Sequence, residues 1–321
     1  MRKLAILIAI FGAAHLAAAR TVWIDTDVSV GSPIREVDDA YALLFAFQSP
    51  EIRIAGISTT YGNASLHRTT RIARDFVQRF GGPAGLESSD VFPGAGSARA
   101  GARPNAANEA LAAALRKQKL TFVALGPLTS LATFLQLHPE LVNRIERVVF
   151  GGGHGPGDPP ALGPSRSFHI HDANVFKDPV AVEMVLRSRI PLTLLPIETS
   201  GRLQVDASEL NELGRSGAPG QFLAQRSKVW LWFWTKFVKT NGGPIFDALA
   251  VVSVTRPDLL TMKTRYARTD GAGNLIVMER QTNGSRLVQC CTGFVPQTNS
   301  FVMRRLNGKL SRDDRDVRAR R

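Results

Sequence analysis

Four aspartates near the start of the chain could do chemistry together. Asp25 and Asp27 follow a short apolar run, and Asp38-Asp39 open an apolar helical run over Ala40–Phe47. Carboxylates brought together without a cation repel one another, and their pKa values rise. A hard divalent metal with oxygen ligands, calcium or magnesium, relieves that repulsion. The pattern therefore predicts a metal site, against the simpler alternative that Asp38 caps the helix and Asp39 is an acid of its first turn.

The elements that must position these side chains alternate between strand and helix. Apolar runs predict strands over Thr21–Ile24, Ile54–Thr60, Thr121–Leu125, Val148–Phe150 and Pro191–Leu195, and amphipathic runs predict helices over Ser65–Phe80, Ser130–Leu137 and Pro179–Arg187. This order predicts an α/β fold, with a mostly parallel, open, doubly wound central sheet and helices on both faces. Ligands of such sheets bind beyond the carboxyl ends of the strands, where Asp27, Asn63 and the Gly126-Pro127 turn fall.

Composition narrows the class of protein. The 321 residues are 44% hydrophobic and 21% charged, which excludes a disordered or collagen-like chain. Two adjacent cysteines, Cys290 and Cys291, exclude a disulfide scaffold and are expected as free thiols near a strand. The formal net charge is +13, but its C-terminal excess lacks interleaved aromatic residues, so no nucleic-acid partner is expected.

The first nineteen residues have the pattern of a secretory signal peptide. Arg2 and Lys3 precede an apolar run from Leu4 to about Ala14, and Ala17-Ala18-Ala19 offers small residues for cleavage. We therefore expect an exported, periplasmic or secreted protein, the alternative being an uncleaved N-terminal anchor. No later segment is long enough to span a membrane. The expected organisation is a signal peptide over 1–19, one α/β domain over 20–310 and a basic tail over 311–321.

Six segments resemble, in order, the motifs of the inosine–uridine-preferring nucleoside hydrolase family. They are Ile24-Asp25-Thr26-Asp27 with Val37-Asp38-Asp39-Ala40, Thr59-Thr60-Tyr61-Gly62-Asn63, Leu125-Gly126-Pro127-Leu128-Thr129-Ser130, Phe150-Gly151-Gly152, Asp172-Ala173-Asn174 with Asp178-Pro179, and Phe246-Asp247-Ala248-Leu249-Ala250. Each segment alone is weak evidence, whereas all six in the family's order are specific. The resemblance covers most of the chain after residue 20.

The resemblance implies an N-ribosyl hydrolase that splits ribonucleosides into ribose and free base with a tightly held Ca²⁺. The implied metal ligands are Asp27, Asp39, the backbone carbonyl of Leu125, and Asp247. Asp27 would also accept a proton from the calcium-bound water. The residues implied to hold ribose hydroxyls are Asp38, Asn63, Asp172 and Asn174, with Asp25 as a supporting carboxylate. The implied partner is a small-molecule nucleoside, and self-association into a homo-oligomer stays open.

This sequence departs from the family pattern at three places. Ten residues, 28–37, separate Asp27 from Asp38 where the family has three, so this stretch must loop out or join the base pocket. Asp172 replaces a glutamate and is one methylene shorter. Phe246 replaces a histidine that protonates the departing base, and a phenyl ring can stack on a base but donates no proton. We therefore expect better activity on purine than on pyrimidine nucleosides.

Two further segments carry side-chain patterns of interest. His154, His169 and His171 lie near the glycine-rich and Asp172 segments, and each could supply the missing acid or simply lie at the surface. A helix is predicted over about Gln221–Lys239, and its aromatic residues at helical spacing favour core packing over a lid or a base-stacking wall. They are Trp230, Phe233, Trp234 and Phe237. Leu275–Met278 and Leu287–Cys291 are predicted strands that could form a hairpin.

Alternative functions stay open at this point. An Asp-x-Asp after a strand also opens Mg²⁺-dependent phosphatases of the haloacid-dehalogenase type, although no downstream Lys and Asp-Asp set is evident. A second alternative is an exported protein that binds ribose or nucleosides but has lost turnover. A third, a basic surface-adhesion protein, is supported only by the sequence pI near 10.5.

Overall fold

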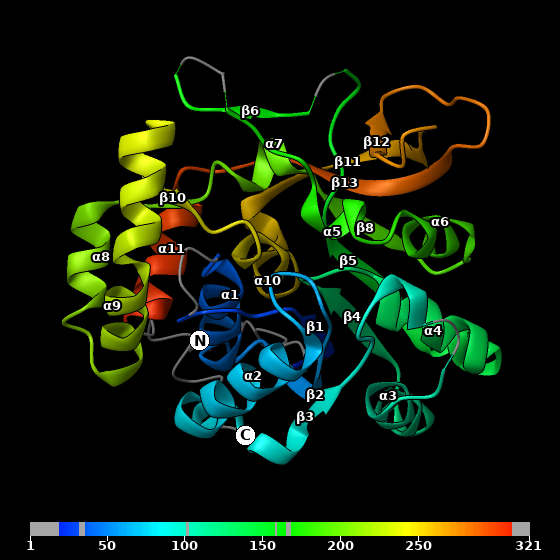
Figure 1. The fold of residues 1–321 in the computed structure, drawn as a ribbon, viewed down its shortest axis with the longest axis horizontal. Coiled ribbons are helices and arrows are strands. Elements are labelled where there is room, and N and C mark those ends of the chain that lie inside the picture. Colours follow the sequence, from blue (N-terminus) through cyan, green and yellow to red (C-terminus); the bar gives the residue numbers. More distant parts are fainter. Residues whose placement is uncertain (1–18, 32–35, 101–102, 158, 165–167, 310–321) are drawn as a thin grey trace, which may run out of the picture.

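The computed structural model describes residues 19–31, 36–100, 103–157, 159–164 and 168–309. They build one nine-stranded sheet in the order β12-β11-β13-β8-β5-β4-β1-β2-β3 (Figure 1). All pairs from β13 to β3 are parallel, and only β11 runs antiparallel to its two neighbours. The predicted mostly parallel α/β fold is therefore confirmed.

The strands and helices have the following bounds. The sheet contains β1 (Arg20–Thr26), β2 (Ile52–Thr59), β3 (Val91–Pro93), β4 (Leu120–Ala124), β5 (Ile145–Gly151), β8 (Leu192–Leu195), β11 (Leu260–Thr269), β12 (Leu275–Met278) and β13 (Arg286–Phe294). The helices of seven or more residues are α1 (Asp38–Phe47), α2 (Leu66–Phe80), α3 (Ala106–Lys117), α4 (Thr129–Leu137), α6 (Pro179–Arg187), α8 (Ala207–Leu213), α9 (Ala218–Trp232), α10 (Ala248–Thr255) and α11 (Gln297–Leu306). Short pieces are α5 (Ala173–Phe176), α7 (Ile197–Ser200) and the two-residue pairs β6 (Ala161–Leu162) with β7 (Phe168–His169) and β9 (Gln204–Val205) with β10 (Gly243–Pro244).

Helices cover both faces of the sheet. Successive side chains of a strand point to opposite faces, so Phe122 and Ala124 of β4 join one core cluster while Val123 joins the other. The first of these clusters contains residues of α3, α4 and α6, and the second contains residues of α1, α9, α10 and α11. The two groups of helices lie on opposite sides of the strands in Figure 1. The core is thus double, as a sheet buried on both faces requires.

The start of α1 bears on the role of its two acids. The cap position is Val37, which makes no side-chain capping hydrogen bond, and Asp38 and Asp39 occupy the first turn. Both aspartates are buried. The alternative that Asp38 caps the helix is therefore wrong, and the favourable helix dipole alone does not account for two buried carboxylates.

The C-terminal part of the sheet differs from the predicted hairpin. The two predicted strands exist as β12 and β13, but each pairs with β11, which lies between them. The hairpin is instead formed by β11 and β12. β13 in turn pairs with β8, so this antiparallel extension continues the parallel sheet. Cys290 and Cys291 lie in β13 as buried free thiols, as predicted.

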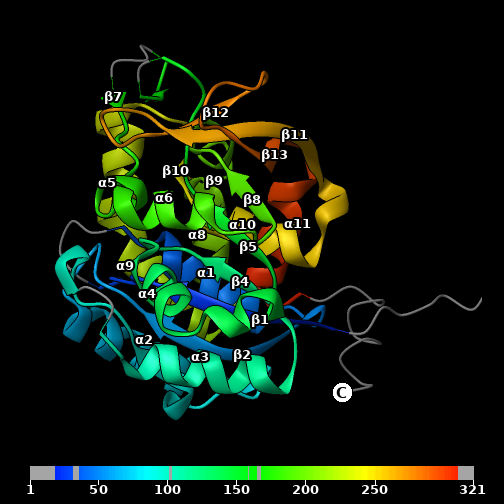
Figure 2. The same cartoon turned by 90° about the vertical axis from the view of Figure 1, so that its right-hand side faces the viewer.

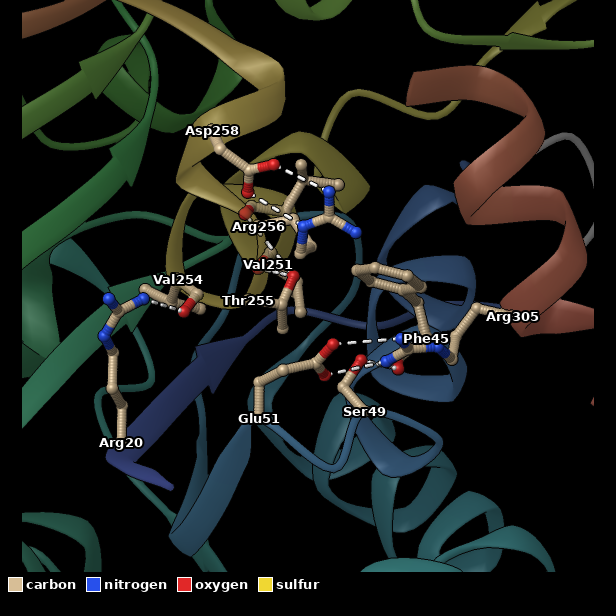
Figure 3. Close-up of polar contacts among 11 residues, drawn as sticks. Arg20, Phe45, Ser49, Glu51, Val251, Val254, Thr255, Arg256, Asp258 and Arg305 are labelled. Atoms are coloured by element: carbon tan, nitrogen blue, oxygen red, sulfur yellow. Dashed lines mark hydrogen bonds and ion pairs between the residues drawn. The ribbon is translucent and has the colours of Figure 1, made fainter. Parts of the chain in front are cut away.

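A buried arginine joins the last helix to the start of β2. The Arg305 guanidinium is paired with both carboxylate oxygens of Glu51 at 2.8 and 3.0 Å, beside the ring of Phe45 (Figure 3). It lies 5.9 Å from the ring centre of Phe45 and 4.9 Å from that of Phe301. Only 1% of Arg305 is exposed. An ion pair at such a position is costly to break, because one charge is left buried without its partner.

The expected signal peptide lies almost wholly outside the described residues, as does the expected tail over 311–321. Figure 2 shows the described chain turned by 90°, with β11 and β12 at one end of the molecule and α2 and α3 at the other. Within the described ranges, no helix is both long and apolar enough to cross a membrane.

Candidate active site

A cavity of about 710 Å³ opens at the carboxyl ends of the parallel strands. Acidic and amide side chains form its floor, and aromatic side chains form its wall. The floor is lined by Asp38, Asn63, Asp172, Asn174 and Asp247, and the wall by Phe168, Trp230, Trp232, Phe233, Trp234, Phe237 and Phe246. The structure thus brings together residues that are up to 209 positions apart, from Asp38 to Asp247.

Three carboxylates of the floor are close enough to hold one cation. Each of Asp38, Asp39 and Asp247 offers an oxygen within 4.8 Å of the others, and all three side chains are buried. Asp247 stands at the cap position of α10 but makes no capping hydrogen bond, so its carboxylate faces the cavity instead. In the described part of the chain, this is the group that meets the geometry of a metal site.

The electrostatics of the floor also favour a cation. Burial, and then repulsion from Asp38, Asp39 and Asp27, raise the pKa of Asp247 well above its ordinary value. Burial raises the pKa of Asp39 to about 6 despite hydrogen bonds from Thr26 and from the Asp27 backbone. Mutual repulsion of buried carboxylates is relieved either by protons or by a divalent ion. The donor set, made only of hard oxygens, fits calcium or magnesium.

Asp27 lies next to this group and is held by the loop after β2. Its Oδ2 accepts a hydrogen bond from the Asn63 backbone N–H at 2.6 Å, and the Asn63 amide spans Asp27 Oδ1 at 3.4 Å and Asp39 Oδ2 at 3.3 Å. Gly62 permits this approach, because a Cβ there would lie 1.7 Å from Asp27 Oδ2. Asp27 is 1% exposed, and burial raises its pKa. The structure therefore groups Asp38, rather than Asp27, with Asp39 and Asp247 at cation-sharing distance.

Asp25 is buried near the end of β1, close to the other acidic side chains. Ser58 donates a hydrogen bond to Asp25 Oδ1, and Trp23 Nε1 donates to Ser58 Oγ at 2.8 Å. The other oxygen, Asp25 Oδ2, is buried and has no hydrogen-bond partner among the described residues. Burial is the main cause that raises the pKa of Asp25 to about 7. A carboxyl in such surroundings favours its neutral, protonated form.

Asp172 and Asn174 are fixed by backbone groups at another side of the floor. Asp172 accepts hydrogen bonds from the Gly153 N–H at 2.6 Å and from the Val175 N–H at 3.1 Å, which caps α5. The Asn174 amide donates to the Leu125 carbonyl at 2.9 Å and to the Gly151 carbonyl at 3.2 Å. The Leu125 carbonyl is thus already bonded, although a carbonyl oxygen has a second lone pair for another partner.

Most of the aromatic wall comes from two segments that the sequence places far apart. The helix predicted over Gln221–Lys239 is α9 followed by a π-helical segment, Phe233–Val238. Phe168 of β7 meets Phe233, Trp234 and Phe237 edge-on, with ring centres 5.7, 5.9 and 6.4 Å apart. The core-packing prediction holds for the buried Trp234 but is wrong for Phe237, which is 64% exposed. These rings line the cavity, as the alternative of a base-stacking wall requires.

Phe246 joins this wall beside the acidic floor. Its ring centre lies 6.2 Å from that of Trp234, and the next residue is Asp247. His169 and His171 line the same cavity, whereas His154 is buried and its Nδ1 lies 2.7 Å from the Gly155 carbonyl oxygen. Two histidines are therefore placed at the cavity, and His154 is a structural residue.

One acid of the cavity has no role in the sequence-based prediction. Glu36 lines the pocket next to Asp38, and its Oε2 accepts a hydrogen bond from Trp230 Nε1 at 3.0 Å. The available signal in the sequence was the position of Glu36 two residues before Asp38. However, ten residues separate Asp27 from Asp38, and the sequence did not indicate which of their side chains would turn toward the cavity. Burial raises the pKa of Glu36 to about 7.

The fold and the site together define an α/β protein with a cavity at the carboxyl ends of its parallel strands, built from an acidic floor and an aromatic wall. The family model described as "Inosine-uridine preferring nucleoside hydrolase" matches residues 22–309, so the chain belongs to this family and the resemblance in its six motifs is confirmed.

Relatives and solved structures agree with this assignment. The chain is 27% identical over 283 residues to uridine nucleosidase 1 of Arabidopsis thaliana, with 78% of each chain covered. It is 26% identical over 261 residues to the pyrimidine-specific ribonucleoside hydrolase RihA of Salmonella paratyphi C, covering 74% of this chain and 82% of that one. The fold is similar to that of a purine-preferring ribonucleoside hydrolase from Gardnerella vaginalis, with a TM-score of 0.75, 22% identity, and coverage of 91% and 100%. The family assignment leaves the phosphatase alternative without support.

Proposed function

We propose that the protein hydrolyses the N-glycosidic bond of ribonucleosides to ribose and free base, with Ca²⁺ as its cofactor. The observation that carries this proposal is the cluster of Asp38, Asp39 and Asp247 at the floor of an aromatic-walled cavity, in a chain of this family. A sugar can bind the polar floor while its base stacks on the wall. Neither part alone would serve a nucleoside.

The cofactor would be held by the carboxylates of Asp38, Asp39 and Asp247, with Asp27 and the Leu125 carbonyl beside them. Calcium fits better than magnesium because it accepts six to eight oxygens in flexible geometry, whereas magnesium requires a near-ideal octahedron. When bound, such an ion lowers the pKa of a water molecule, orients it and grips vicinal hydroxyls.

The residues of the chain supply the remaining steps. Breaking the bond at the anomeric carbon builds positive charge on the sugar ring, and a floor of carboxylates stabilises that charge more than it stabilises the neutral substrate. Asp27, fixed by two hydrogen bonds from Asn63, would accept a proton from the attacking water. Asn63 and Asp38 would hold ribose hydroxyls, together with Asp172 and Asn174 on another side of the floor.

Sugar recognition by these groups predicts rejection of deoxyribose. A substrate that lacks a hydroxyl leaves a buried polar group of the site unpaired, and such losses discriminate strongly. We expect kcat/KM for inosine to exceed that for 2′-deoxyinosine by at least about 100-fold. Comparable values for the two substrates would contradict this assignment.

Base preference follows from the wall. Phe246, Trp234 and Phe233 present ring faces and edges but no acid, so we propose better turnover of purines, whose larger rings stack more strongly. His169 and His171 are the candidate proton donors at the cavity. Side-by-side assays of inosine and uridine test this preference, which a strong preference for uridine would overturn.

The decisive experiment measures reducing sugar released from a nucleoside panel, with and without chelator, for wild type and Asp27→Asn. We expect release that chelator abolishes, that Ca²⁺ restores, and that the variant loses by about 1,000-fold or more. Asp90→Asn, in the short 3-10 helix Ser88–Asp90 and outside the cavity lining, is the matched control. Calorimetric binding of nucleosides without release would instead support the alternative of a binding protein that has lost turnover.

Export is a separate proposal that depends on the first nineteen residues. If they are a signal peptide, the mature protein recovered from outside the cytoplasm begins near Arg20, and the enzyme scavenges extracytoplasmic nucleosides. N-terminal sequencing of the recovered protein tests it, and an intact Met1 would contradict cleavage.

A further inference from the structure

Glu36 is a pocket carboxylate that the roles proposed so far do not use. It comes from the connection between β1 and α1, and it lines the cavity at the boundary between the acidic floor and the aromatic wall, with Asp38 on one side and Trp230 on the other. Its Oε2 is bonded to Trp230 Nε1 at 3.0 Å. Among the described residues, no donor reaches its other oxygen, Oε1.

The tryptophan that holds Glu36 has little freedom to move. Trp230 is 6% exposed, and its ring is stacked on Tyr41 with centres 6.1 Å apart. The ring packs so tightly on Gly243 that a Cβ there would lie 2.2 Å from it. The indole N–H therefore has a fixed direction, and it fixes the carboxylate that accepts from it.

The backbone around Glu36 is anchored as well. Ser29 Oγ donates a hydrogen bond to the Glu36 carbonyl at 3.1 Å, which ties the two ends of the long connection together. Gly31 lies against the same helix α9, with Arg226 Nη1 3.1 Å from the place of its Cβ. The connection thus passes close to α9 beside Arg226 and is hydrogen-bonded to it one helical turn further along, at Trp230. Glu36 is held in place before any ligand arrives, and pre-organisation of this kind favours binding.

The polar groups on another side of the floor already have backbone partners, so only part of their hydrogen-bonding capacity is left for a ribose. Both oxygens of Asp172 accept backbone N–H groups, and the Asn174 amide donates to two backbone carbonyls. A nucleoside has more donors than the metal-binding carboxylates can satisfy. An additional acceptor with one free oxygen is what such a substrate requires.

We propose that Glu36 is a specificity-determining residue, whose Oε1 accepts a hydrogen bond from a donor of the bound nucleoside; this inference rests on the proposed function. Trp230 is the positioning residue that orients the Glu36 carboxyl group. The donor is an O–H of the sugar or an amino N–H of the base. Loss of a hydrogen bond to a carboxyl acceptor of this kind changes kcat/KM by about 10-fold.

The test compares wild type with Glu36→Gln on matched substrates. The sugar arm uses inosine and its 2′-, 3′- and 5′-deoxy analogues, and the base arm uses adenosine and purine riboside, which lacks the amino group. For wild type, the measured quantity is the ratio of kcat/KM for each parent nucleoside to kcat/KM for its analogue. We expect this ratio to be raised for one analogue, because that analogue lacks the donor that binds Glu36. In Glu36→Gln, that ratio falls by about 10-fold or more while the other ratios stay within twofold. The analogue affected identifies the donor.

Further variants separate recognition from structure. Glu36→Ala should reproduce the loss, Trp230→Phe should produce part of it, and the double variant Glu36→Gln/Trp230→Phe should be no worse than Glu36→Gln. Glu146→Gln, at the opposite end of β5, is the control. Circular dichroism and thermal melting check that each variant is folded, and any misfolded variant is replaced in the comparison by Glu36→Gln alone.

The outcomes are distinct. Equal discrimination by wild type and Glu36→Gln across all the analogues overturns the role of Glu36 while leaving the hydrolase proposal intact. If wild type releases no sugar from any nucleoside, the hydrolase proposal fails instead. In that case, calorimetry measures the Kd values of the parent nucleosides and their analogues for wild type and Glu36→Gln. A ratio of Kd values that falls in Glu36→Gln for one analogue supports the role of Glu36, and unchanged ratios overturn it.

Discussion

The contact between Gly62 and Asp27 gives the sharpest test of the proposed proton acceptor. In Gly62→Ala, the new methyl group would lie 1.7 Å from Asp27 Oδ2 and 2.7 Å from its Cγ, whereas ordinary contact begins near 3.4 Å. Either the loop or the carboxylate must move by about 1.5 Å. The 2.6 Å hydrogen bond from Asn63 N–H to Asp27 cannot survive such a shift.

Two independent estimates give the size of the effect. Loss of a hydrogen bond to a charged acceptor costs about 1.5–3 kcal/mol, and a factor of ten in rate corresponds to about 1.4 kcal/mol. The expected fall in kcat/KM is therefore about 10- to 150-fold. A displacement of about 1 Å at a reacting group costs about 100-fold, which lies in the same range.

The assay is sugar release from inosine at saturating Ca²⁺, together with thermal melting of each variant. Gly82→Ala is the matched control, because a Cβ at Gly82 meets no atom within 4 Å. We expect the control to match wild type. A Gly62→Ala enzyme within twofold of wild type in kcat/KM would refute the claim that this loop holds Asp27 for catalysis.

Three further predictions concern the cation, the leaving group and the fold. Without a cation, Asp25 and Asp39 have folded pKa values of about 7 and about 6, above the ordinary 3.8, so the stability of the fold falls as pH rises from about 4 to about 7. In chelator, Tm should therefore be higher at pH 5 than at pH 8, and added Ca²⁺ should raise Tm more at pH 8. An equal effect of Ca²⁺ on Tm at both pH values would contradict this. Phe246→His should raise kcat about 10-fold for inosine, because the histidine can protonate the departing base. It should not raise kcat for nitrophenyl riboside, whose leaving group needs no proton. Equal gains on the two substrates would argue against base protonation. Arg305→Met should lower the free energy of unfolding by about 2–4 kcal/mol, because it leaves the Glu51 carboxylate unpaired. Urea denaturation measures this free energy, with Arg305→Lys as control. A change below about 1 kcal/mol would contradict the prediction.

The floor of the site was accessible to sequence reasoning, because strand ends of a parallel sheet converge. Asp27, Asn63 and Asp247 needed only their motifs and that rule. The relative positions of Asp27 and Asp38 within the floor were not accessible, because they depend on where α1 begins after a long connection. Glu36 was missed for the same reason: its inward direction is set by Trp230, which lies 194 residues away.

The errors outside the floor also have physical causes. β11 was missed because few of its side chains are buried, so no apolar period marks it, and pairing on both sides holds it in place. The prediction that the aromatic residues from Trp230 to Phe237 pack in the core assumed an α-helix with 3.6 residues per turn. The chain changes to a π-helix at Phe233, which alters the direction of each later side chain and leaves Phe237 exposed at the cavity.

The two ends of the cavity are built from different kinds of structure. Strand ends and the first turn of α1 make most of the acidic end, while Phe168 of β7 and Phe233 and Phe237 of the segment after α9 lie outside the central sheet. Substitutions at these three aromatic positions can therefore accumulate without disturbing the carboxylates or the sheet. A scaffold divided in this way lets one reaction pass to new bases over evolutionary time, while the chemistry at the sugar is inherited unchanged.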